Sequence, residues 1–227
     1  TLTAAYNIEY LLTVTGVHAA TTGSGWYAAG DEADFSIAET IVLPNGPDVR
    51  YEFLKWEGAY TGSAASATVT MDSAITETAV WQKQFRLTTE AIPDTGGSVE
   101  IIPPGEWCNA DSERQVAAIA DPSFGWYSWQ GGVNATDNDT VTVTMDTSKH
   151  VQAGFKKKID ITYKTIPERL VYRIDGKEFV QDTTFTYLEG DVVTLSIADK
   201  DTIQSGGTGI RYMFNQWSDG GARTHEY

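Results

Sequence analysis

Thr70–Trp81 reads TMDSAITETAVW, and the same pattern returns as TMDTSKHVQAGF in Thr144–Phe155. In each copy the Met and the Ala are eight residues apart, and an aromatic residue follows two positions later. A fresh β-rich run then begins at Phe85 in the first case and at Ile159 in the second. Self-similarity at a fixed period predicts a tandem array of small domains, each closed by a strand from this segment.

Other landmarks repeat at the same spacing. Trp56 and Trp129 are 73 positions apart, and Met71 and Met145 are 74 positions apart. Trp217 ends a run, RYMFNQW, that copies the run RYEFLKW ending at Trp56. A recurrent apolar residue on an alternating strand is usually buried, so we expect these three Trp and two Met in the repeat cores.

The β-branched, Thr-rich and aromatic content, without helical periodicity, predicts an all-β chain. We expect three tandem small β-domains, arranged as beads on a string. Residues 1–6 would be the closing strand of a preceding or neighbouring repeat, 7–83 repeat one, and 84–156 repeat two. Residues 157–227 would be repeat three, lacking its last strand, because the next Met position falls beyond Tyr227 at the spacing of repeat two.

The first six residues have the alternation of the closing segment. Leu2, Ala4 and Tyr6 share one face of an extended strand and match the alternate residues of Val151–Phe155. We assign these three residues to a subunit interface in which a neighbouring molecule receives them by strand addition. Such a contact is head-to-tail and generates a filament. The alternative is that the chain is a window from a longer array.

Composition excludes several classes of function. The net charge is −15 with 16 Lys and Arg, which argues against nucleic-acid binding. Lys156–Lys158 is the one basic cluster, and we expect it to be a solvated linker between repeats. No apolar run is long enough to span a membrane, and no leader-like stretch is present, so we expect a mature product or a fragment. Cys108 is the single Cys, expected to be buried, with an intermolecular bridge as the alternative.

Three motifs together resemble the divergent internalin B-repeat, also called the bacterial repeat domain. They are G-x-Y-x-x-G at Gly25–Gly30, F-x-x-W-x-G at Phe53–Gly58, and the closing segment. Repeat two lacks the Phe three residues before Trp129, and repeat three has one extra residue before its Gly220. The resemblance implies β-grasp-related domains, with sandwich-like domains as the alternative, on secreted and surface proteins of bacteria and archaea. It implies stalks or spacers without catalysis.

We expect no enzyme and no cofactor. His18, His150 and His225 are too scattered to indicate a metal site or a catalytic group by spacing. The acidic stretch Asp137-Asn138-Asp139 leaves calcium as the one ion to consider, although the Gly of an EF-hand is absent. Asn134 and Asn138 each begin an N-x-[ST] sequon and are the predicted glycosylation sites.

These observations predict an extracellular, cell-surface structural protein, a subunit of a filament, sheath or stalk that self-associates head-to-tail. The alternative is an adhesin or carbohydrate-binding module of a larger secreted protein, with a glycan ligand on Trp26, Trp107 or Trp126. A non-catalytic appendage of a secreted enzyme is a third reading.

Overall fold

The computed structural model describes residues 1–44, 46–133 and 138–227. In these ranges the secondary structure is strands and two short 3-10 helices, without an α-helix, so the all-β prediction is confirmed. The chain divides into two compact units. The first comprises residues 1–91, 99–119 and 128–153, and the second comprises residues 92–98, 120–127 and 154–227.

Repeat one is a sandwich of two sheets, the second of the two expected architectures. Its strands are β1 (Glu9–Thr15), β2 (Thr21–Thr22), β3 (Gly25–Ala28), β4 (Glu32–Ile37), β5 (Ile41–Val42), β6 (Val49–Glu57), β7 (Ser66–Thr70) and β8 (Ile75–Ile92). One sheet is β2-β4-β7, and the other contains β3, β1, β8, β6 and β5. Thr78 pairs with Thr15 of β1 and with Glu57 of β6, so β8 lies between these two strands.

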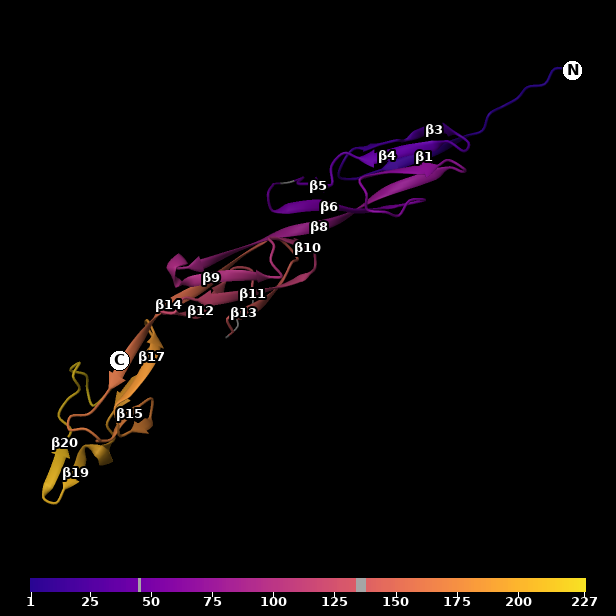
Figure 1. Ribbon diagram of the computed structural model, residues 1–227. Coiled ribbons are helices and arrows are strands. Elements are labelled where there is room, and N and C mark those ends of the chain that lie inside the picture. The colour runs from indigo at the N-terminus through magenta and orange to yellow at the C-terminus, as the bar shows by residue number, and fades with distance from the viewer. Residues whose placement is uncertain (45, 134–137) are drawn as a thin grey trace. The chain divides into compact units, whose positions relative to one another are not determined.

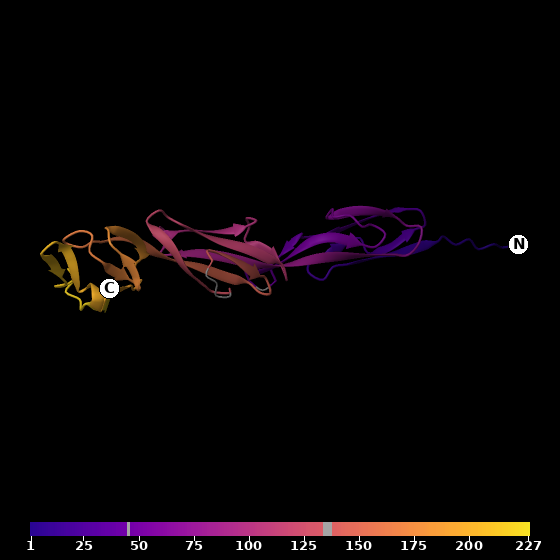
Figure 2. The same ribbon diagram turned by 90° about the horizontal axis from the view of Figure 1, so that it is seen from below.

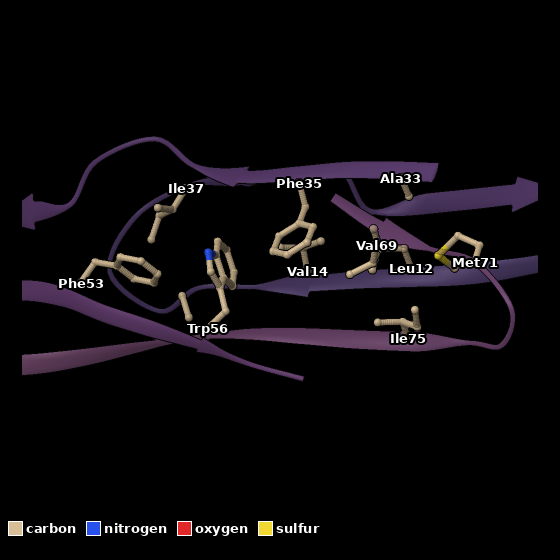
Figure 3. Close-up of a cluster of buried hydrophobic side chains, with 11 residues drawn as sticks. Leu12, Val14, Ala33, Phe35, Ile37, Phe53, Trp56, Val69, Met71 and Ile75 are labelled. Atoms are coloured by element: carbon tan, nitrogen blue, oxygen red, sulfur yellow. The ribbon is translucent and has the colours of Figure 1, made fainter. Parts of the chain in front are cut away.

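The core of repeat one fills the space between its two sheets (Figure 3). Alternation on β4 buries Ala33, Phe35 and Ile37, as period-two patterning predicts. Trp56 approaches from the opposite sheet and meets Phe35 edge-to-face, with ring centroids 4.9 Å apart. The aromatic pair therefore joins the two layers.

The joint between repeats one and two is a single strand. β8 is 18 residues long and includes both the closing segment around Ala79 and the run that opens at Phe85 (Figure 1). β14 (Lys149–Tyr163) likewise carries both parts of the second joint. The predicted linker at Lys156–Lys158 is therefore wrong, because these residues continue the strand. The Lys156 ammonium lies 3.8 Å from the ring centre of Tyr127.

Repeat two repeats the turn that precedes the closing strand. Its other elements are η1 (Asp94–Gly96), β9 (Gly97–Ile102), β10 (Trp107–Asn109), β11 (Glu113–Ala120), β12 (Phe124–Gln130) and β13 (Thr140–Thr144). The Met145 N–H donates to the Ser112 carbonyl at 2.8 Å, as the Met71 N–H donates to the Asp31 carbonyl at 2.8 Å. Each Met thus fixes the strand before it to the start of the neighbouring strand.

Repeat three lies in the second unit. Its elements after β14 are β15 (Tyr172–Ile174), β16 (Lys177–Phe179), β17 (Thr183–Leu188), β18 (Thr194–Ser196), η2 (Asp199–Asp201), β19 (Ile203–Gly207), β20 (Ile210–Met213) and β21 (Thr224–Glu226). Asp175 and Gly176, a pair typical of two-residue hairpin turns, join β15 to β16 with φ of 50° and 78°. β21 pairs with β18 as β7 pairs with β4 in repeat one.

Candidate assembly site

Repeat one shows how a closing strand covers the core. Ala79 of β8 stands opposite Trp56 of β6, and Trp81 stands opposite Phe53. The Trp81 ring packs edge-on against Phe53 at 5.9 Å and against His18 at 5.4 Å, measured between ring centres. The small side chain of Ala79 leaves room for the Trp56 indole. Trp81 occupies the next position on the same face of β8.

The predicted core residues occupy comparable places in repeats one and two. Trp56, Met71 and Met145 are 0% exposed, and Trp129 is 8% exposed. Each of the three repeated Trp donates its indole N–H to a backbone carbonyl six to nine residues further along, at 2.9–3.2 Å. The acceptors are the carbonyl oxygens of Ala64, Asn138 and Arg223. Trp217 differs because it is only half-buried.

The strand register identifies the parts of repeat three that correspond to repeat one. Ile159 pairs with Tyr187 as Tyr10 pairs with Tyr27, so Ile159–Tyr163 takes the place of β1. β20 pairs with β19 in the register in which β6 pairs with β5, with Tyr212 at the position of Tyr51. In repeat one β8 lies between the two strands that these segments replace.

A groove of about 480 Å³ lies at this place in repeat three. One wall follows β14, and the other is the segment that begins in β20. The apolar lining residues include Ile166, Pro167, Val171, Met213, Phe214 and Trp217. Phe214 and Trp217 are half-buried and outside any strand, whereas Phe53 and Trp56 are buried in β6. The third core is therefore incompletely covered beside this groove.

Tyr163 at the end of β14 belongs to the buried core of repeat three and directly precedes the groove residue Lys164. Its side chain is 6% exposed, and burial raises the pKa of its phenol above the usual value. The groove begins at the next residue, and its lining includes the charged side chains Lys164, Asp201 and Arg211 beside the apolar ones.

The predicted interface residues are all available to solvent. Thr1–Tyr6 is exposed throughout and precedes the first strand, as Figure 2 shows. Leu2 is fully exposed and Tyr6 is 90% exposed. Ala4 lies between them in the same exposed segment. The structure thus leaves this segment free of core contacts, while its pairing with a partner stays a prediction.

The other predicted sites are only partly within the described chain. Asn138 is exposed, whereas Asn134 and Asp137 lie outside the described residues. Over the described ranges no group of three or more His, Cys, Asp or Glu side chains comes together in an arrangement suited to a metal ion. Cys108 is fully buried in β10, opposite Phe85.

The three Trp residues named as candidate glycan contacts, Trp26, Trp107 and Trp126, lie in different environments. Trp26 is 67% exposed and stands opposite Leu11 on the adjacent strand β1. Trp107 is half-buried, with the Arg50 guanidinium 4.6 Å from its ring centre. Trp126 is also half-buried. Only Trp26 of the three therefore presents a largely open aromatic face.

The walls of the groove were not identified from the sequence. Ile166 and Pro167 lie in the stretch after β14, which differs in length and residues from the stretch after β1. A repeat search aligns what recurs, so residues in such a variable connection give no periodic signal. In the structure Ile166 and Pro167 line the same groove as Phe214.

The family model described as "Divergent InlB B-repeat domain" matches residues 10–85 and 87–159. The chain belongs to this family, which indicates a repeat protein of the bacterial cell surface. No curated protein and no solved structure matches the chain significantly. Within the part of the chain that is described, no helix is long and apolar enough to cross a lipid bilayer.

Proposed function

We propose that this chain is an extracellular structural subunit of a cell-surface filament, sheath or stalk, without catalytic activity or a cofactor. Its copies associate head-to-tail, and the N-terminal segment of one copy closes the third repeat of the next. The observation that carries this proposal is a complementary pair: an exposed segment with the closing pattern, and a third core left half-covered at Phe214 and Trp217.

The joints between repeats support a mechanical role. Because β8 and β14 each carry the end of one repeat and the start of the next, consecutive repeats share a strand. A strand donated from another molecule would give the same connection between subunits. The net charge of −15 keeps such subunits soluble before they assemble.

Sedimentation velocity and electron microscopy test this proposal on the purified chain. We expect concentration-dependent linear assemblies, and we expect a variant lacking Thr1–Tyr6 to stay monomeric. The deletion leaves the cores intact because the segment is exposed and precedes β1. Equal assembly by the deletion variant contradicts strand donation, as does native material whose peptides continue beyond Tyr227 and fill the third repeat.

A glycan-binding module is the second candidate, and exposed Trp26 favours it. Together with Leu11, which is 38% exposed, Trp26 forms an apolar surface on adjacent strands. Aromatic faces of this kind stack on sugar rings. A glycan array should show binding that Trp26→Ala removes and that substitution of half-buried Trp107 does not. A chain that binds no glycan excludes this candidate.

A further inference from the structure

We infer that the groove of repeat three is a socket for Tyr6 of a second copy, so that the joint between molecules reproduces the joint between repeats. This inference rests on the proposed function and specifies its binding site. It fixes the direction, the register and the aromatic anchor of the incoming strand.

The spacing around Tyr6 is that of an internal joint. At both internal joints the aromatic residue ending the closing pattern stands four positions before the residue that opens the next run. The N-terminal segment has the same spacing before β1. The three pairs are Trp81 and Phe85, Phe155 and Ile159, and Tyr6 and Tyr10. Residues 1–15 therefore have the pattern of a strand shared by two repeats, like β8 and β14. Within the chain only its second part, β1, is paired with other strands.

The register of β8 gives the position of each donated residue. In repeat one Ala79 stands opposite Trp56, and the strand runs parallel to β1 and antiparallel to β6. Transferred to repeat three, the same register sets Ala4 opposite Trp217. A residue with a small side chain is needed there, because the indole occupies the adjoining core space.

The next residue on that face is Tyr6, which takes the place of Trp81 in repeat one. In repeat one Trp81 lies between Phe53 and His18, which belongs to the connection after β1. In repeat three the corresponding surroundings of Tyr6 are Phe214 and the connection containing Ile166. Ile166 is 87% exposed, so its side chain is available for contact with Tyr6 of a second copy.

The segment would enter a groove of mixed lining, in which apolar side chains lie beside Lys164, Asp201 and Arg211. Residues 1–8 read TLTAAYNI and contain no charged side chain. Main-chain hydrogen bonds supply affinity in strand addition, and side chains at alternate positions supply selectivity. Leu2, Ala4 and Tyr6 are the alternate positions that face inward.

A peptide-binding experiment with full-length protein tests the socket separately from filament formation. The receptor is the Ala4→Trp chain, in which the substitution blocks self-donation while the groove is unchanged. A labelled peptide of residues 1–8 should bind it, as measured by fluorescence anisotropy. The Ala4→Trp peptide should bind at least about tenfold more weakly because Trp overfills the site.

The matched control is the Ala5→Trp peptide, which has the same composition but places Trp on the opposite face. We expect its affinity to stay within about threefold of the wild-type peptide. Ile166→Asp in the receptor should weaken wild-type peptide binding without unfolding the protein, since this side chain is exposed. Equal binding of the two Trp peptides, or no effect of Ile166→Asp, overturns the socket.

The two proposals fail in distinguishable ways. Peptide binding with the predicted selectivity, in a wild-type chain that forms no linear assemblies, supports the socket and rejects the filament. Linear assembly that persists in the full-length Ala4→Trp chain rejects the socket and leaves the filament standing.

Discussion

Trp56 of β6 stands directly opposite Ala79 of β8, and the two side chains are 0% and 5% exposed. The pair joins the last long strand of the repeat to the strand that closes it. Trp129 and Ala153 are buried as well in repeat two. Trp217 is half-buried in repeat three, and Ala4 is exposed at the other end of the chain.

Replacing the buried indole should destabilise repeat one. We expect Trp56→Ala to lower the free energy of unfolding by about 3–5 kcal/mol, because it removes a fully buried aromatic side chain and leaves a cavity. Trp26→Ala is the matched control, and its effect should be within about 0.5 kcal/mol because Trp26 is 67% exposed. Denaturant unfolding measures both, and similar losses would show that Trp56 is not a core anchor.

Enlarging the small residue opposite the indole should also cost stability. Ala79→Leu adds volume to a packed position and should destabilise the first unit by about 1–3 kcal/mol. Ala4→Leu should leave the monomer's stability within about 0.5 kcal/mol, since Ala4 makes no core contact there. Thermal unfolding of dilute protein compares the two variants. A large loss for Ala4→Leu would mean that the segment packs in its own chain.

Acid should weaken the C-terminal part of the second unit. The Gly221 N–H and, next, the His225 side chain lower the pKa of Asp219 below its ordinary value of 3.8. A carboxyl group with a depressed folded-state pKa stabilises the fold above its unfolded pKa, and this contribution is lost as pH falls through the folded pKa. The His225 Nε2 lies 2.8 Å from the Asp219 Oδ2, and this contact connects Asp219 to β21.

Asp219→Asn tests this assignment. The variant should be less stable than wild type at neutral pH, and the difference should shrink in acid. Melting temperatures of the second unit over a pH series measure the effect, with exposed Asp182→Asn as the control. A wild-type and variant difference that does not change with pH would exclude a role for the Asp219 charge.

The sequons predict glycans on native material from a host that glycosylates such sites. Asn138 is exposed, and its backbone carbonyl accepts the Trp129 indole N–H, so a glycan on the side chain need not disturb that bond. Intact mass should exceed the sequence mass, and Asn→Gln at both Asn134 and Asn138 should abolish the excess. Native protein at its sequence mass would reject this prediction.

Periodic features of the fold were predictable from the sequence. The Met and Trp landmarks gave the repeat, since a residue with the same packing role recurs at the same spacing. The pair Asp175-Gly176 is typical of the β15–β16 turn, because both positions of that turn have a left-handed backbone, which Asp and Gly tolerate. These signals are local and depend on one strand or turn at a time.

Strand register and joints were less predictable. By residue pattern Gln115–Ile119 resembles Ala33–Ile37, but the structure pairs Glu113 with Thr144, as Glu32 pairs with Thr70. The true alignment is shifted by one residue, so that Val116 takes the buried place of Phe35. Ile119 is consequently 46% exposed. Because Val116–Ile119 are all apolar, the sequence does not show which face of β11 is buried until the pairing with its partner strand is known.

Loop length concealed one further strand. The sequence spacing placed the end of repeat three beyond Tyr227, because Met145 lies 16 positions after Trp129 in repeat two. The loop after Trp217 is shorter, so β21 already occupies the place of β7. What repeat three still lacks among the described residues is a counterpart of the closing part of β8.

Disulfide trapping between two full-length variants tests whether the N-terminal segment of one copy pairs with the third repeat of another. Lys55 pairs with Val80 in repeat one, and the corresponding positions are Gln216 in the groove and Ala5 in the donated segment. Mixed Ala5→Cys and Gln216→Cys chains should form a heterodimeric disulfide, because cross-strand neighbours lie within disulfide reach. Cys108 is fully buried and does not compete. Ala5→Cys with Met213→Cys is the out-of-register control. We expect trapping of the first pair alone, and equal trapping of both pairs, or of neither, would show that the segment does not enter the groove in this register.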